Sequence, residues 1–387
     1  MHDSNLKLKL PLIYFIMYSG FSCYFGFLTP YFLDRKLSYV QIGAAFALMA
    51  FISIVVQPGW GYITDKYLNK KKTLVLLLSV CSVLMLTLAV ARSYVAVMIC
   101  LFFVQFFHCP LMAISDAYCY DITEESKTVH YGKIRLMGSA GYAIGALVLG
   151  YIAQFFGINS PYFAYTLLMV VTLLMLVGID FKGKKAESKP HLGDALNIVR
   201  NAKFSIFVLS VMVFNIALGA HNNNAAVLIE KTGGNVSSVG ILWSVIAFSE
   251  LPLFFLGGRI ISRFGELNMY LFAVAVYGFR FFLSSISGSY VAVIAIQAFQ
   301  GLAYPFYLMG ALQYVSKIVP SGLKATSITL LSSLGFGLGN FLGSLMGGAV
   351  MQRFDVFILY KLIAVICISG VAVGFIPKLL GKNTQTA

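Results

Sequence analysis

The sequence is poor in charge. Asp, Glu, Lys and Arg make up only 11% of its 387 residues, whereas hydrophobic residues make up 59%. Soluble domains are about a quarter charged and hide their apolar residues in compact cores, so this balance excludes a water-soluble protein. The apolar residues gather in long runs, each near the roughly 20 residues that cross the hydrocarbon of a bilayer. We therefore interpret the chain as a membrane protein.

The short alternating segments that build membrane β-barrels are missing. The long apolar runs predict an all-α fold instead, in which every backbone polar group is paired within its own helix. We expect twelve transmembrane helices, over residues 11–33, 40–63, 73–91, 94–118, 134–156, 160–179, 204–229, 238–262, 268–287, 290–315, 325–351 and 356–377.

Patterns that would indicate metal, nucleotide or enzyme chemistry are also missing. The six cysteines have no metal-like spacing, and the five histidines are scattered without a catalytic arrangement. No Walker loop for ATP is present, and the glycines after Arg135 do not form a dinucleotide fingerprint. We expect neither a cofactor nor an enzyme activity.

Acidic residues are half as frequent as basic ones, 14 against 28. A net charge of +14 can indicate a nucleic-acid partner, but most of the basic residues fall in loops on the side of the N-terminus. This is the positive-inside asymmetry of membrane proteins. It predicts an inner or plasma membrane protein with both termini in the cytoplasm and no nucleic-acid partner. The run after Lys7 and Lys9 is too long for a signal peptide and is predicted to be a retained helix.

The longest polar stretch divides the chain into two parts of six helices each. We expect an N-terminal half at 1–180, a cytoplasmic linker at 181–203 and a C-terminal half at 204–387. The halves echo one another: "LSYVQIG" opens the second helix as "VSSVGIL" opens the eighth. A parallel six-helix repeat is the architecture of major facilitator transporters, and we expect such a carrier to be a monomer.

The loop "GYITDKYLNKKK" after the second helix resembles the signature loop of those transporters. Gly61, Asp65 and Lys66 carry this resemblance. An acid at a helix end beside cations can bridge to a neighbouring helix in one conformation and release it in another, so we expect a conformational latch here. The alternative is an ordinary basic loop.

Charged residues inside the spans are the strongest functional signal, because they are costly in hydrocarbon and usually face a partner or a cavity. Glu250 and Arg280 lie near the middles of the eighth and ninth helices and are expected to pair. Asp116, near the end of the fourth helix, can approach Arg135 at the start of the fifth. The alternatives are structural ion pairs, a snorkelling Arg135 and solvated helix ends, and Asp121 is interpreted as such an end.

Two helices also carry uncharged polar groups. The seventh contains "HNNN", residues 221–224, and amides rarely face lipid because each needs partners there. We expect Asn222 and Asn223 to line a cavity, or else to form a polar packing seam. Gln300 lies in the tenth helix, three residues after Gln297.

Together these residues resemble the lactose permease branch of the major facilitator superfamily, the oligosaccharide and nucleoside proton symporters. Four segments carry the resemblance in order: "VVQPGWGYITDK", "YGKIRLMGSAGY", "GFRFFLSSISGS" and "YPFYLMGALQYVSK". It implies proton-coupled uptake of a sugar or oligosaccharide by alternating access. It also implies that Asp116 binds the sugar with Arg135 as its partner, that Tyr142 stacks on a sugar ring, and that Glu250 and Arg280 correspond to charged residues of the site. We expect Asp116, Arg135, Glu250 and Arg280 to form the polar core, with Tyr142, the asparagines of the seventh helix and Gln300 around the ligand.

The sequence departs from this pattern in the tenth helix, where Gln300 and Ala303 stand in place of a histidine and a proton-binding glutamate. Asn222 replaces an acid of the seventh helix. Proton coupling would then pass through Glu250 or Asp116, and uniport is an alternative. Uptake of a nucleoside or an aromatic acid remains open, whereas drug efflux is less favoured because the fifth helix has no internal proline.

Overall fold

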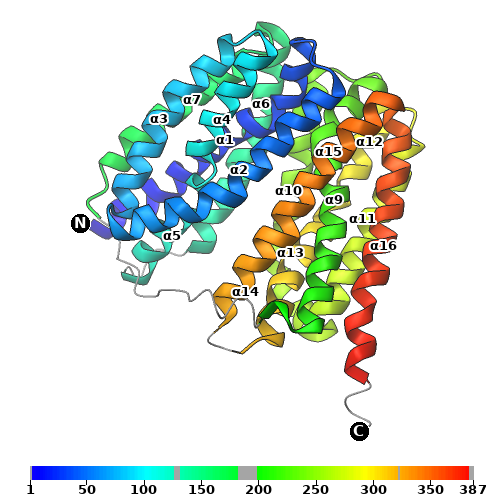
Figure 1. Ribbon diagram of the computed structural model, residues 1–387. Coiled ribbons are helices and arrows are strands. Elements are labelled where there is room, and N and C mark those ends of the chain that lie inside the picture. Colours follow the sequence, from blue (N-terminus) through cyan, green and yellow to red (C-terminus); the bar gives the residue numbers. More distant parts are fainter. Residues whose placement is uncertain (1, 126–130, 182–197, 321–322, 383–387) are drawn as a thin grey trace. The chain divides into compact units, whose positions relative to one another are not determined.

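The computed structural model describes residues 2–125, 131–181, 198–320 and 323–382, which are predominantly helical (Figure 1). The predicted linker at 181–203 lies mostly outside the described residues. The helices are α1 (His2–Asp34), α2 (Tyr39–Lys66), α3 (Lys70–Val90), α4 (Tyr94–His108), α5 (Leu111–Glu125), α6 (Tyr131–Phe156), α7 (Ser160–Val177), α9 (Ala202–Lys231), α10 (Val236–Phe264), α11 (Glu266–Ser285), α12 (Tyr290–Gln297), α13 (Gln300–Ile318), α14 (Lys324–Leu330), the π-helix η2 (Leu331–Gly337), α15 (Leu338–Arg353) and α16 (Val356–Lys382).

Twelve segments of the described chain are long and apolar enough to cross a membrane. This confirms the predicted all-α fold with twelve spans and makes the chain a multi-pass membrane protein. The sequence predicted each span as one continuous α-helix, and for three spans this prediction was wrong. The fourth is interrupted at Cys109–Pro110 and the tenth at Ala298–Phe299, while the eleventh contains the π-helix η2. Pro110 has no amide hydrogen to continue the ladder, whereas no proline marks the tenth span at its interruption.

The chain divides into two compact units, which are described separately. Unit 1 comprises Met1–Leu37, Ile52–Glu187 and Gly234–Phe248; unit 2 comprises Ser38–Phe51, Ser188–Gly233 and Ser249–Ala387. In unit 1, α1 lies along α6 and α7, and α3 lies along α4 and α7. In unit 2, α9 packs between α15 and α16, while α11 contacts α13 and α16 (Figure 1).

Glycines allow the fifth helix of each half of the sequence to approach the first helix of that half. A Cβ atom added to Gly141 of α6 would lie 2.1 Å from the backbone oxygen of Phe15 in α1. A Cβ atom on Gly343 of α15 would lie 2.2 Å from the backbone oxygen of Ile216 in α9. Neither position has room for a side chain. A close approach through a glycine therefore occurs between the corresponding pair of helices in both units.

Each unit also contains one crossing of two glycines from distant parts of the sequence. In unit 1, a Cβ atom on Gly150 would lie 2.9 Å from the Cα atom of Gly240. In unit 2, a Cβ atom on Gly43 would lie 2.9 Å from the Cα atom of Gly348. These contacts explain why short segments of α2 and α10 group with the opposite half of the sequence. Small residues serve this kind of close approach in membrane helices.

An ion pair joins the third and fourth spans of each half. Lys70 Nζ lies 2.7 Å from the Asp121 carboxylate, with side-chain exposures of 15% and 10%. Lys317 Nζ lies 3.1 Å from Glu266, with exposures of 69% and 22%. Asp121 is therefore not the solvated helix end that its place beside a loop suggested; it is a largely buried partner of Lys70. The pair in unit 2 is the more exposed of the two.

Candidate functional site

Asp116 on α5 is the centre of a polar cluster in unit 1. The Tyr14 hydroxyl of α1 donates a hydrogen bond of 2.9 Å to Asp116 Oδ1. Arg135 and Tyr131, both on α6, are close enough to act electrostatically on this carboxyl group. Asp116 and Arg135 are each half-buried. The structure thus brings Asp116 and Arg135 into one cluster, as their positions at the ends of adjoining helices predicted.

Aromatic residues of α1 support this cluster. The rings of Tyr14 and Tyr18 are stacked, with centroids 5.6 Å apart and an angle of 20° between them. The guanidinium carbon of Arg135 lies 4.7 Å from the centre of the Tyr18 ring, within the range of a cation–π interaction. Tyr142 follows Arg135 by two helical turns on α6 and is half-buried. The sequence analysis missed Tyr14 and Tyr18, although their i, i+4 spacing places them on one face of α1.

Glu250, Gln300 and Arg280 form the corresponding cluster of unit 2. Arg280 Nη1 donates a hydrogen bond of 2.5 Å to Gln300 Oε1. Gln300 Nε2 donates one of 2.8 Å to Glu250 Oε1. The carboxamide of Gln300 therefore bridges the two charges that the sequence predicted to pair, with its oxygen toward the cation and its nitrogen toward the acid.

Arg280 is completely buried, at 0% exposure. Its guanidinium carbon lies 4.5 Å from the centre of the Tyr277 ring and 4.9 Å from that of Phe281. Within the described residues, Arg280 Nε and Nη2 have no hydrogen-bond partner. A buried cation is tolerated only when it is paired and hydrogen-bonded, so Gln300 and the two rings are central to holding Arg280 in the interior.

The polar residues of α9 have different surroundings. His221 Nδ1 lies 2.8 Å from the Tyr360 hydroxyl of α16. Asn223 Nδ2 donates a hydrogen bond of 2.8 Å to Ser344 Oγ of α15, and Asn224 Nδ2 donates to the backbone oxygen of Ala220. Asn222 is exposed. His221 and Asn223 thus connect α9 to its neighbours, whereas Asn222 lies at an exposed position of the helix.

The predicted latch lies at the end of α2 in unit 1. Asp65 and Lys66 are exposed, and among the described residues no atom beyond the neighbouring backbone of α2 lies within 4 Å of a Cβ atom added to Gly61. Lys66 Nζ donates a hydrogen bond of 2.6 Å to the Tyr62 hydroxyl. It also lies 5.1 Å from the ring centre of Tyr67. In this structure the loop is therefore accessible, and the nearby ion pair between spans is formed by Lys70 and Asp121.

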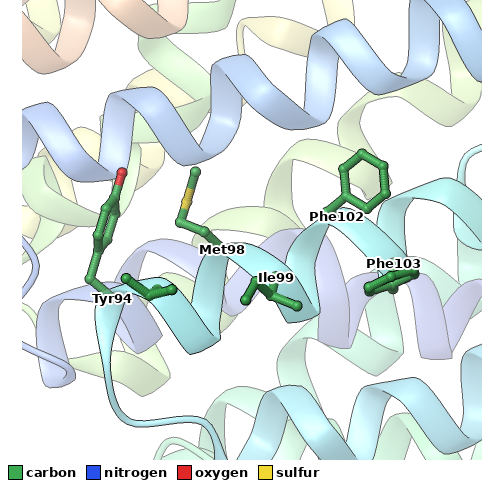
Figure 2. A pocket seen from close by; sticks show the side chains of 6 residues that line it. Tyr94, Met98, Ile99, Phe102 and Phe103 are labelled. Atoms are coloured by element: carbon green, nitrogen blue, oxygen red, sulfur yellow. The ribbon is translucent and has the colours of Figure 1, made fainter.

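A hollow of about 370 Å³ runs along α4 in unit 1. Figure 2 shows Tyr94, Met98, Ile99, Phe102 and Phe103 arranged along this helix. The lining is apolar apart from the Tyr94 hydroxyl, so it suits acyl chains better than a hydroxylated solute. Among the described residues, no group of three or more His, Cys, Asp or Glu side chains is placed to hold a metal ion.

Charge clusters inside membrane spans, in a chain whose halves repeat one packing pattern, define the class of secondary transporters. The chain belongs to the MFS_1 like family, whose model matches residues 7–362. It is therefore a major facilitator transporter of a small solute and not an enzyme. This confirms the family resemblance that the four sequence segments carried.

Relatives with assigned transport activities lie at low sequence identity. The chain is 25% identical over 383 residues to the maltose permease of Geobacillus stearothermophilus, covering 98% of this chain and 96% of that one. It is 22% identical over 354 residues to the lactose permease of Klebsiella oxytoca, covering 86% and 84%. A crystal structure of a mutant of the nucleoside transporter NupG matches with a TM-score of 0.88 at 16% identity, over 96% of this chain and 99% of that chain. The last match supports the fold.

Proposed function

We propose that the chain takes up a sugar or oligosaccharide together with a proton, by alternating access. The observation that carries the proposal is the balance of charge in the two clusters. In unit 1, Asp116 and Arg135 both contact the stacked pair Tyr14 and Tyr18, and in unit 2 Glu250 is joined to Arg280 through Gln300. Each cluster thus holds one acid and one cation, a combination that suits a neutral solute.

The chemistry of the clusters matches hydroxyl groups. A carboxylate accepts hydrogen bonds from hydroxyls, and a guanidinium donates to their oxygens. An anionic solute would be repelled by Asp116 and Glu250, and a cationic one by the arginines. In this proposal Asp116, Arg135, Tyr142, Asn222, Asn223, Glu250 and Gln300 bind the solute. The permeases for maltose and lactose among the relatives support this substrate class.

Glu250 is the acid that we propose to carry the proton. Its carboxylate ends the hydrogen-bonded chain that begins at the buried Arg280. Protonation would neutralise Glu250 and thereby remove the counter-charge that Arg280 has through Gln300. It would therefore change the relative energies of the inward-open and outward-open conformations. Gln300 cannot carry the proton because a carboxamide does not titrate near neutral pH. Asp116 is the alternative carrier, and uniport is the outcome if neither acid is coupled.

A nucleoside is the second solute that we consider. The structural likeness to the nucleoside transporter NupG favours it, and the ring of Tyr142 can stack on a base as well as on a sugar. A nucleoside is neutral and carries ribose hydroxyls, so the charge balance fits it equally. Only a direct comparison of solutes separates the two.

We further propose an inner-membrane orientation with both termini in the cytoplasm, and a monomeric carrier. The halves 1–180 and 204–387 would move relative to each other around the solute. Gly61, Asp65 and Lys66 would act as a latch that holds one conformation. Their exposure in this structure is compatible with a latch that is released.

Flux into proteoliposomes tests the proposal, with sugars, nucleosides and aromatic acids compared with and without an imposed pH gradient. We expect the wild-type protein to accumulate a sugar under the gradient. Glu250→Gln should retain exchange of labelled for unlabelled sugar but lose the gradient-driven accumulation, because an amide cannot take up the proton. Glu230→Gln, at an exposed position on α9, is the matched control. Full accumulation by Glu250→Gln would remove Glu250 from the coupling step.

A further inference from the structure

The Tyr18 hydroxyl is unusual in the unit 1 cluster. Tyr18 is 4% exposed, and among the described residues its hydroxyl has no hydrogen-bond partner. A buried hydroxyl without a partner is unfavourable. The Tyr18 phenol is nevertheless in the field of both Arg135 and Asp116. An unsatisfied donor and acceptor therefore lies beside the charged pair that we propose to bind solute.

Tyr14 lies one turn earlier on α1, and both its hydroxyl group and its ring make contacts in the cluster. Its hydroxyl donates to Asp116 Oδ1 at 2.9 Å, and its ring stacks on Tyr18. Hydrogen bonds to a charged group are among the stronger ones in proteins. This bond fixes one oxygen of Asp116, so the orientation of the carboxylate toward a solute depends on Tyr14.

We propose that α1 supplies two tyrosines to the solute site, with different roles. Tyr14 is a positioning residue that acts through Asp116, whereas Tyr18 binds a solute hydroxyl directly through its own hydroxyl group. Arg135, held over the Tyr18 ring at 4.7 Å, donates to the same part of the solute. The inference rests on the proposed function, in which the Asp116 and Arg135 pair binds a neutral hydroxylated solute.

Asp116, Arg135 and Tyr18 together recognise a particular arrangement of hydroxyl groups on the solute. Asp116 accepts a hydrogen bond, Arg135 donates, and the Tyr18 hydroxyl does either. A solute with two adjacent hydroxyls satisfies all three groups at once. A solute that lacks one of these hydroxyls leaves the Tyr18 oxygen or the carboxylate unpaired in a buried site, which lowers its affinity.

Substitution by phenylalanine separates the two roles because it removes only the hydroxyl and keeps each ring. Solute affinity is measured by calorimetry on purified Tyr14→Phe, Tyr18→Phe and Tyr24→Phe proteins. Tyr24 is the matched control, since it is a buried tyrosine of the same helix whose hydroxyl donates to Gln105 Oε1 at 3.0 Å, away from the cluster. We expect the dissociation constant to rise about tenfold in Tyr14→Phe and in Tyr18→Phe, and to be unchanged in Tyr24→Phe.

Two further comparisons of solute affinity distinguish these roles from a purely structural one. For Tyr14, the substitution is repeated in an Asp116→Ala background, where it should have no additional effect because the carboxylate that Tyr14 positions is absent. For Tyr18, the affinity is measured for solutes that lack one hydroxyl at a time. One of these deoxy solutes should bind wild-type and Tyr18→Phe proteins equally.

The results separate the inference from the proposed function. Additive losses of solute affinity in the Tyr14 and Asp116 double variant would overturn the positioning role of Tyr14. Direct binding by Tyr18 would be overturned if Tyr18→Phe bound the solute as tightly as Tyr24→Phe, or if its affinity fell equally for every solute. If the wild-type protein binds no neutral hydroxylated solute, the proposed function and the role of Tyr18 both fail. The coupling of Tyr14 to Asp116 is then still measured with whichever solute of the panel binds. It can also be measured by thermal unfolding of the wild-type protein, the two single variants at Tyr14 and Asp116, and the double variant.

Discussion

The two arginines within the clusters are held in opposite ways. Arg135 in unit 1 is half-buried, lies over the ring of Tyr18 and acts on a carboxylate that also accepts a hydrogen bond from Tyr14. Arg280 in unit 2 is fully buried and reaches its acid only through the carboxamide of Gln300. A half-buried pair can exchange its partners for solute oxygens at lower cost than a fully buried cation, which depends on every partner it has. The comparison suggests that unit 1 contributes more to solute affinity and unit 2 more to stability and coupling.

Removal of the buried cation should have the largest effect. Arg280→Leu removes the buried cation that Gln300 connects to Glu250, and breaking a buried charge network by deleting one member costs about 3–5 kcal/mol. We expect a loss of that size in the free energy of unfolding, measured by denaturant titration in detergent, together with loss of transport. Arg92→Leu, at an exposed position, should change stability by less than about 0.5 kcal/mol. Equal stabilities of the two variants would remove the distinction between the clusters.

The glycine contacts test whether the two units share one packing even though their clusters differ. Gly141→Ala and Gly343→Ala each place a methyl group within 2.2 Å of a backbone oxygen. Overpacking of this kind costs about 1–3 kcal/mol, so the thermal midpoints of both variants should fall by similar amounts. Gly59→Ala is the control because, in the part of the chain that the structure describes, only the neighbouring backbone of its own helix comes within 4 Å of the added Cβ atom. A large effect in only one unit would contradict the repeated packing.

Asp116→Asn tests the other side of the comparison. The amide keeps an oxygen that can accept from Tyr14 but loses the charge that acts together with Arg135. We expect the dissociation constant of the solute to rise about tenfold, which corresponds to about 1.4 kcal/mol, with little change in unfolding. A fall in stability as large as that of Arg280→Leu would mean that unit 1 is sealed in the same way as unit 2.

The smallest effect should come from the exposed ion pair. Lys317→Ala removes a partner of Glu266 that is 69% exposed, and such pairs contribute about 0–1 kcal/mol. Lys70→Ala breaks the ion pair with Asp121, in which the Lys70 side chain is only 15% exposed and the Asp121 side chain 10%. Its effect on the unfolding free energy should therefore be larger. Raising the salt concentration should weaken the Lys317 contribution first. A reversed order would contradict the difference in burial between the two pairs.

The sequence predicted the spans well because each apolar run is long enough to be recognised by itself. Their interruptions were missed for different reasons. Pro110 was a visible signal for the fourth span, since proline cannot donate to the helical ladder. The interruption at Ala298–Phe299 and the π-helix beginning at Leu331 have no such marker, so they depend on packing that one sequence does not reveal.

The candidate site was predicted in its charged residues but not in its supporting ones. Asp116 and Arg135 are costly in a membrane and therefore stand out in the sequence. Tyr14 does not, because tyrosines are common in this chain and its bond to Asp116 joins positions 102 residues apart. The bridge through Gln300 was hidden for the same reason, since only the folded chain brings it between Arg280 and Glu250.

The six cysteines have a practical consequence for testing alternating access. Cys23, Cys81, Cys119 and Cys367 are buried, while Cys100 and Cys109 are partly exposed. Thiol reagents reach buried side chains poorly, so replacement of these last two would leave a background that is nearly silent to labelling. Pairs of spin labels attached to new cysteines, one in each unit, would then report how the separation between the units changes when solute binds.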